Sequence, residues 1–77
     1  MKIGQKIKKV EFTLNKSDFI PLNNLLKLLR LVGTGGEANI RIENGEVMVN
    51  GAVETQKRKK LRPGDVVLFE ETSITIQ

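Results

Sequence analysis

The stretch PLNNLLKLLRLVGTGGE, from Pro21 to Glu37, decides the fold, because it holds one complete helix pattern and the start of a second. Pro21 suits the first position of a helix, and Gly33 suits a helix end. Between them, apolar residues recur at helical spacing, at Leu22, Leu25, Leu26, Leu29 and Val32. The spacing predicts a helix that ends near Gly33, with its leucines in the core and with Lys27 and Arg30 reaching solvent.

The last four residues of the stretch, Thr34 to Glu37, fit a capping box, in which the threonine oxygen accepts from an amide and the glutamate reaches back. The following EANIRIEN is ambiguous. Ile40 and Ile42 alternate as in a strand, whereas Ala38 and Ile42 share a helical face. The cap favours a second, short helix that Gly45 should end.

Strand patterns flank the two helices. Residues 8–14 alternate between polar and apolar side chains, as in a half-buried strand, and their lysine-rich start suits an edge strand. After the helices, Asn50-Gly51 separates EVMV from AVET, which is the strongest short signal for a β-hairpin. Residues 62–65 then predict a tight turn, followed by strands at 66–70 and 73–76. The order predicts an α+β fold, with two short helices in a helix-turn-helix-like pair packed on a small, mostly antiparallel sheet.

Composition limits the chemistry. The 77 residues are enough for one domain, 1–77, and contain no cysteine and no histidine. Disulfides, thiolate metal sites and the usual general base are thereby excluded, and the acids form no convincing catalytic pair. We expect no enzymatic activity, cofactor, metal or small-molecule substrate. No apolar run approaches the roughly 18 residues of a membrane span, so we expect a cytoplasmic protein without a membrane partner.

The positive charge is concentrated in one segment. The chain has 13 Lys and Arg against 9 Asp and Glu, and five of the cations fall within Lys57–Arg62. Without them, eight cations face nine acids. A smaller cluster of Lys2, Lys6, Lys8 and Lys9 lies near the N-terminus. Charge gathered in this way predicts a polyanionic partner.

The motifs LLKLLRLVGTGGEA, NGEVMVNGAV and KLRPGDVV, in this order, resemble the RNA-binding domain named after ribosomal small-subunit protein four, the S-four domain. The chain is most similar to its stand-alone bacterial members, the YbcJ-like and YaaA-like small proteins. The resemblance covers a core motif at 20–70, preceded by the N-terminal strand at 8–14. It implies the αL RNA-binding motif, in which the helix pair and the basic connection face RNA.

The resemblance also implies which residues face the RNA. Cations remain at Lys27 and Arg30 on the first helix and at Arg41 on the second. Gly35 and Asn39 stand where the family often has cations. With the basic connection, and with Thr34 to Gly36 as a candidate phosphate seat at a helix start, the candidate set is Lys27, Arg30, Thr34, Gly35, Gly36, Asn39, Arg41, Lys57, Arg58, Lys59, Lys60 and Arg62.

Structured RNA is therefore the expected partner, of the ribosomal, transfer or precursor kind, and association with the ribosome is left open. With three phenylalanines as the only aromatics, recognition of RNA shape and backbone fits better than base stacking on an aromatic platform. One alternative stays open, a protein-interaction subunit that uses the same basic face on an acidic partner. A ubiquitin-like sulfur carrier would need a C-terminal Gly-Gly, and because the sequence reads Thr75-Ile76-Gln77 at its end, we do not expect that function unless the natural terminus is longer. Duplex DNA lacks an evident recognition helix.

Overall fold

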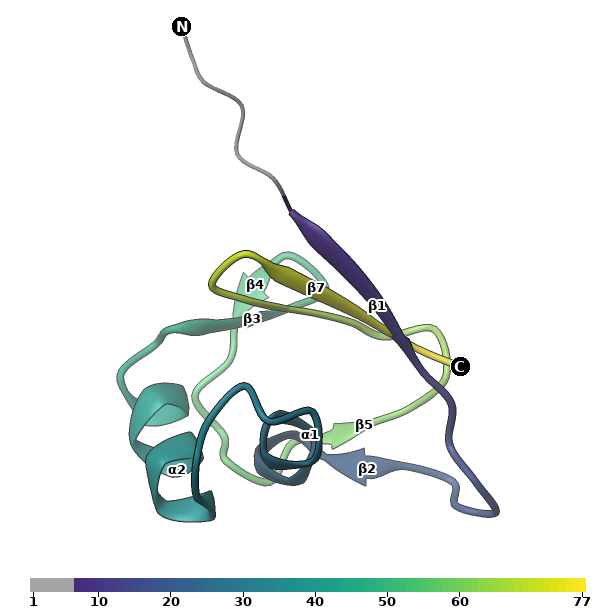
Figure 1. Ribbon diagram of the computed structural model, residues 1–77, viewed down its shortest axis with the longest axis horizontal. Helices are drawn as coiled ribbons and strands as arrows, with labels where there is room; N and C mark the ends of the chain where they lie inside the picture. The colour runs from purple at the N-terminus through teal and green to yellow at the C-terminus, as the bar shows by residue number, and fades with distance from the viewer. Residues whose placement is uncertain (1–6) are drawn as a thin grey trace, which may run out of the picture.

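The computed structural model describes residues 7–77 and has an α+β architecture (Figure 1). Two helices lie below a five-stranded sheet in the view of Figure 1, and a second, two-stranded pair lies beside the first helix. The main sheet has the order β1-β7-β6-β3-β4. Its β1–β7 pair is parallel and its other three pairs are antiparallel. The predicted fold class, a helix pair on a small and mostly antiparallel sheet, is confirmed.

The strands of the main sheet are β1 (Lys8–Phe12), β3 (Val47–Val49), β4 (Ala52–Val53), β6 (Val66–Phe69) and β7 (Thr72–Ile76). Strand β1 is at the sheet edge, as predicted, but ends at Phe12 instead of residue 14. The chain nevertheless follows its neighbour for two more residues, because the Leu14 amide donates to the Gln77 carbonyl at 2.9 Å. Lys8 and Lys9 begin this strand, and Lys2 and Lys6 lie outside the described residues.

The β3–β4 hairpin turns at Asn50-Gly51, as the sequence predicts. Asn50 has φ 53° and Gly51 has φ 85°. Two positive φ angles define the type I′ turn, whose twist matches that of the flanking strands.

Helix α1 (Leu22–Leu28) is shorter than predicted, and Pro21 is its N-cap instead of its first helical residue. It ends in a Schellman motif: the Leu31 amide donates to the Leu26 carbonyl, and the Arg30 amide donates to the Lys27 carbonyl, both at 3.0 Å. Arg30 takes the left-handed position of this motif, with φ 59°, where glycine is usual. The helix therefore stops before the glycine that the sequence pattern favours.

Helix α2 (Gly35–Glu43) confirms the helical reading of the ambiguous segment. Thr34 is its N-cap, and its side chain accepts from the Glu37 amide at 3.0 Å. The helix ends in the same motif as α1, here with Gly45 at the left-handed position, φ 78°.

The core lies between the helix pair and the inner face of the sheet. Its buried residues are Ile20, Leu22, Leu25, Leu26, Val32, Ala38, Ile42, Val47, Val49, Leu61, Val67, Phe69, Ile74 and Ile76. The α1 leucines are thus mainly core residues, as expected, with Leu28 as the exception at 61% exposure.

Candidate nucleic-acid interface

Residues Lys57–Arg62, the basic segment, form a turn followed by strand β5 (Lys60–Leu61). Strand β5 pairs antiparallel with β2 (Ile20–Pro21), with Lys60 opposite Pro21. The Leu61 side chain is fully buried, whereas its neighbours Lys60 and Arg62 are exposed. Strand alternation therefore anchors the segment by its single apolar residue and turns the flanking cations outward.

The basic segment also caps helix α1. The Leu22 amide donates to the Lys59 carbonyl at 2.9 Å, and the Asn23 amide donates to the Lys57 carbonyl at 3.0 Å. Amides in the first turn of a helix have no partner within the helix, and Pro21 offers no side-chain cap. The main chain of the basic segment supplies that cap, which fixes the cations relative to α1.

A network of hydrogen bonds fixes the other end of the segment. The Asp65 carboxylate accepts from the Arg62 amide at 2.9 Å and from the Asn50 side chain at 3.0 Å. These two hydrogen bonds hold the pKa of Asp65 below its ordinary value, and the bond from the Arg62 amide has the larger effect. The Asn50 side-chain oxygen in turn accepts from the Val66 amide at 2.9 Å. The hairpin turn and the turn after the basic segment are thus one unit.

Most cations of the segment are not neutralised within the chain. Lys57 pairs with Glu43 at the end of α2, with 3.1 Å between Nζ and Oε2. Arg58, Lys59, Lys60 and Arg62 make no ion pair with a carboxylate of residues 7–77.

Lys27 and Arg30 lie at the opposite end of α1 from the basic segment. Both are exposed, and they line one open hollow together with Gly33 and Glu37. At 1.5 Å per residue, the six steps from Leu22 to Leu28 separate the two ends of the helix by about 9 Å. Neither cation pairs with a carboxylate within the described part of the chain. The helix therefore carries unpaired positive charge at both of its ends.

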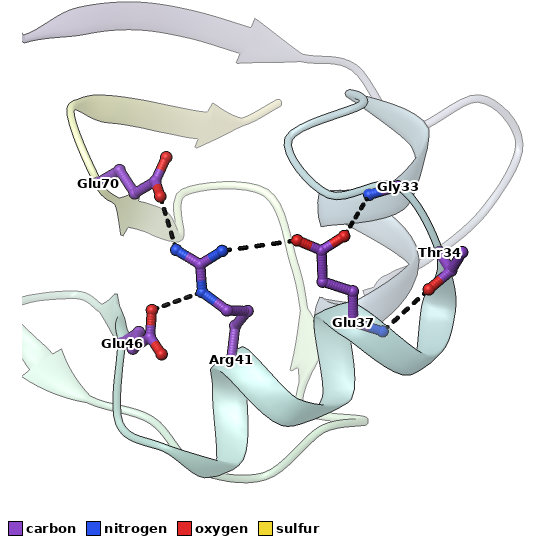
Figure 2. A network of polar contacts seen from close by, with 6 residues as sticks. All are labelled: Gly33, Thr34, Glu37, Arg41, Glu46 and Glu70. Atoms are coloured by element: carbon purple, nitrogen blue, oxygen red, sulfur yellow. Dashed lines mark hydrogen bonds and ion pairs between the residues drawn. The ribbon is translucent and has the colours of Figure 1, made fainter.

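Arg41 is in a different environment (Figure 2). Its guanidinium donates hydrogen bonds to Glu46 and to Glu70, the latter at 2.6 Å. It also lies 3.6 Å from the Glu37 carboxylate, and its central carbon lies 4.8 Å from the centre of the Phe69 ring. The hydrogen bonds to Glu46 and then Glu70 raise its pKa. Three carboxylates surround this one cation, so it joins α2 to the β6–β7 turn and leaves an acidic surface.

The candidate phosphate seat at the start of α2 has a carboxylate of the chain beside it. A Glu37 carboxylate oxygen accepts from the Gly33 amide at 2.8 Å, while the Glu37 amide donates to Thr34 (Figure 2). Neither Gly35 nor Gly36 is needed to relieve crowding, because a Cβ on either would meet no atom closer than 3.8 Å. A negative charge of the chain therefore lies next to this helix start, which makes it a poorer site for a phosphate.

Asn39 connects the two helices. Its side-chain oxygen accepts from the Asn23 amide group at 3.0 Å, in a partly buried contact. The Asn23 side-chain oxygen is buried and has no hydrogen-bond partner among residues 7–77. Asn39 is thus engaged in the joint between α1 and α2.

The structure brings one further residue to the basic segment. Phe19 is half-buried, and its ring centre lies 5.0 Å from Lys60 Nζ and 5.9 Å from the Arg62 guanidinium carbon. The sequence offers little signal for this contact, because the β2–β5 pairing that creates it involves two residues on each strand. Strand β1 begins above the other strands in Figure 1, away from α1 and β5, and Lys8 and Lys9 are its first two residues.

Two other kinds of feature are absent from residues 7–77. No three acidic side chains in the described range 7–77 are grouped closely enough to hold a metal ion. In the same range, no helix has the length and apolar character needed to cross a membrane.

The chain belongs to the S4 domain family, whose sequence pattern it matches over residues 12–77. This is the ribosomal-protein-four domain that the motif order resembles, so the family prediction is confirmed. The "Putative RNA-binding protein YbcJ" of Escherichia coli (strain K12) is 42% identical over 65 residues, covering 84% of this chain and 93% of that protein. The "Uncharacterized protein YbcJ" of Shigella flexneri matches with the same identity and coverage.

The fold is also similar to a solved structure. The solution structure of YbcJ from E. coli, described as revealing an αL motif involved in RNA binding, has a TM-score of 0.68 and 37% identity to this chain. The similarity covers 99% of this chain and 96% of that one. The predicted αL arrangement, and the likeness to YbcJ-like proteins, are therefore confirmed.

Proposed function

We propose that this protein is a non-catalytic module that binds structured RNA through the surface around α1. Membership of the S4 domain family and similarity to relatives named for RNA binding support the choice of RNA over another polyanion. The observation that carries the proposal is the fixed placement of the basic segment. Its carbonyls cap α1, its cations point away from the core, and four of them have no carboxylate partner among residues 7–77.

The candidate residues take different roles in this proposal. Phosphate contacts come from the basic segment at one end of α1 and from Lys27 and Arg30 at the other. Phosphate neutralisation with release of counterions supplies most sequence-independent affinity for nucleic acid. Arg41 is assigned to holding α2 against the sheet, because three carboxylates already surround it. The Thr34 to Gly36 turn and Asn39 are assigned to shaping the helix pair.

The acidic surface around Arg41 supports a defined orientation on the RNA. Glu37, Glu46 and Glu70 together outweigh the one cation that they surround. Such a surface repels phosphates, whereas the basic segment attracts them. Lys27 and Arg30 attract phosphates less strongly, because Glu37 also lines their hollow. The partners that we propose are ribosomal, transfer or precursor RNAs, with the protein acting in the cytoplasm and, in one form of the proposal, on the ribosome.

A matched pair of double variants tests the proposal. Lys59→Gln with Lys60→Gln removes two cations from the basic segment, and Lys8→Gln with Lys9→Gln removes two from the distant edge strand. Binding of a structured RNA is measured by fluorescence anisotropy over a range of salt concentrations. The first pair should weaken binding and reduce the salt slope by about 1.4–1.8, at about 0.7–0.9 per phosphate contact. The second pair should leave the slope nearly unchanged.

Equal losses of RNA affinity in the two double variants would mean that net charge alone governs binding. That result would refute the proposal of a defined binding surface. The open alternative, an acidic protein partner, is separated by a pull-down with and without ribonuclease. Loss of the partners on ribonuclease treatment supports RNA, and partners that survive it favour protein contact. Crosslinking in cells followed by sequencing of the recovered RNA identifies the class of RNA.

A further inference from the structure

A second cavity lies beside the basic segment and takes no part in the phosphate contacts proposed above. It measures about 290 Å³ and lies between the end of β1, the loop that leads to β2, and α1. Its apolar wall is formed by Phe12, Leu14, Phe19, Pro21 and Leu28. Leu28 is the most exposed large apolar side chain of the described residues, at 61%, so this wall is open to solvent.

The polar groups of the cavity are uncharged. Amide and hydroxyl side chains of Asn15, Ser17 and Asn24 line it, and no acidic side chain does. Such groups both donate and accept hydrogen bonds, as the edge of a nucleobase requires. The volume is just below the roughly 300–1,000 Å³ of drug-sized sites, which suits one ring system.

Phe19 joins this cavity to the basic segment. Its ring lines the cavity, and the cationic groups of Lys60 and Arg62 lie 5.0 and 5.9 Å from its centre. An aromatic ring, neutral hydrogen-bonding groups and two adjacent cations match the three parts of a nucleotide: the base face, the base edge and the phosphate. An apolar side chain of a protein partner would use the wall alone and gain nothing from the cations.

We propose that this cavity binds one unpaired nucleobase of the RNA, stacked on Phe19, while Lys60 and Arg62 hold the adjoining phosphate. The inference rests on the proposed RNA binding and adds a ligand class to it: structured RNA with a nucleotide turned out of its helix. Unstacked bases are the part of RNA that side chains read most readily. The shape-and-backbone recognition expected from the sequence is thereby extended by one base contact.

The test uses three RNA hairpins: a fully paired one, one with a single unpaired adenosine, and one with an abasic site at that position. Stacking on one aromatic ring corresponds to about a 5- to 150-fold preference. The wild-type protein should prefer the adenosine hairpin over the abasic one by a factor in this range. Phe19→Leu should reduce the preference to near one while retaining the affinity for the paired hairpin, which also shows that the variant is folded.

Phe12→Leu is the matched control, because Phe12 lines the same cavity and no cation of the described residues lies over its ring. A loss in Phe12→Leu as large as that in Phe19→Leu would overturn the assignment of Phe19. A measurement on the wild-type protein avoids any question of folding: the NMR signals of the Phe19 ring should shift with the adenosine hairpin and not with the abasic one. Unshifted signals would overturn the inference.

The two proposals fail in different ways. Wild-type protein that binds all three hairpins equally overturns the nucleobase site and leaves the RNA-binding function standing. Wild-type protein that binds none of the hairpins, nor any RNA recovered by crosslinking, overturns both.

Discussion

Replacement of Arg30 by glycine should make the protein more stable and a weaker RNA binder. Arg30 occupies the left-handed position that ends α1, at φ 59°, whereas α2 ends in the same motif with Gly45. A non-glycine residue in this conformation costs roughly 1–2 kcal/mol, and glycine loses roughly 0.5–1 kcal/mol through its freer unfolded chain. At the centres of these two ranges the net gain in the free energy of unfolding is about 0.8 kcal/mol, or roughly 3–6 °C in Tm for a domain of this size.

The binding effect of the same substitution has the opposite sign. Arg30 is exposed and unpaired within residues 7–77. Its loss should reduce the salt slope of RNA binding by about 0.7–0.9, the contribution of one phosphate contact. Thermal and urea unfolding measure the stability, and anisotropy at several salt concentrations measures the binding.

Two companion variants separate charge from backbone conformation. Arg30→Lys keeps both the charge and the strained position, so both quantities should stay near the wild-type values. Arg30→Asn removes the charge but tolerates the left-handed region, so binding should fall as in Arg30→Gly with a smaller gain in stability. A destabilised Arg30→Gly would refute the conformational reasoning, and an unchanged salt slope would refute the phosphate contact.

Three further variants test the roles assigned to the turns. Thr34→Ala should lower the free energy of unfolding by about 1 kcal/mol through loss of the N-cap and leave the salt slope of RNA binding unchanged, whereas a changed slope would return Thr34 to the interface. Gly45→Ala should destabilise by roughly 1 kcal/mol in urea unfolding, because its φ of 78° is left-handed and the strain of a side chain there exceeds the gain from a less flexible unfolded chain; a neutral result would contradict that assignment. The pKa of Asp65 is lower in the folded protein than in the unfolded chain, where it is about 3.9. Its hydrogen bonds to Arg62 and Asn50 therefore stabilise the protein fully when the pH is above the unfolded pKa, and this stabilisation is lost as the pH falls through the folded pKa. Asp65→Asn should therefore flatten the dependence of Tm on pH below about pH 4. A plot of Tm against pH that runs parallel to that of the wild type would show that Asp65 does not cause this dependence.

Local signals in the sequence predict much of the fold. The Asn50-Gly51 turn and the Thr34 cap each depend on neighbours within a few residues, and both are confirmed. The end of α1 is different. Arg30 adopts a conformation that the pattern reserves for glycine, and a helix pattern that continues to Val32 conceals the stop. Steric preference is a tendency, and here the Schellman hydrogen bonds override it.

The candidate site is less predictable, because charge in a sequence does not reveal its partners in space. Arg41 looks like the other cations in the printed sequence, yet Glu70, twenty-nine positions away, is one of its hydrogen-bond partners. Phe19 likewise meets Lys60 only through the short β2–β5 pairing. Whether a cation is available to RNA depends on such long-range contacts.

The capping of α1 by the carbonyls of Lys57 and Lys59 affects the thermodynamics of association. Because main-chain hydrogen bonds hold this segment, its backbone is ordered before any ligand arrives. Association then has little further loop entropy to overcome, and substitution of the side chains leaves the carbonyls in place. Calorimetry of RNA binding should accordingly show the small heat-capacity change of rigid docking, without the large negative value that accompanies folding of a disordered arm.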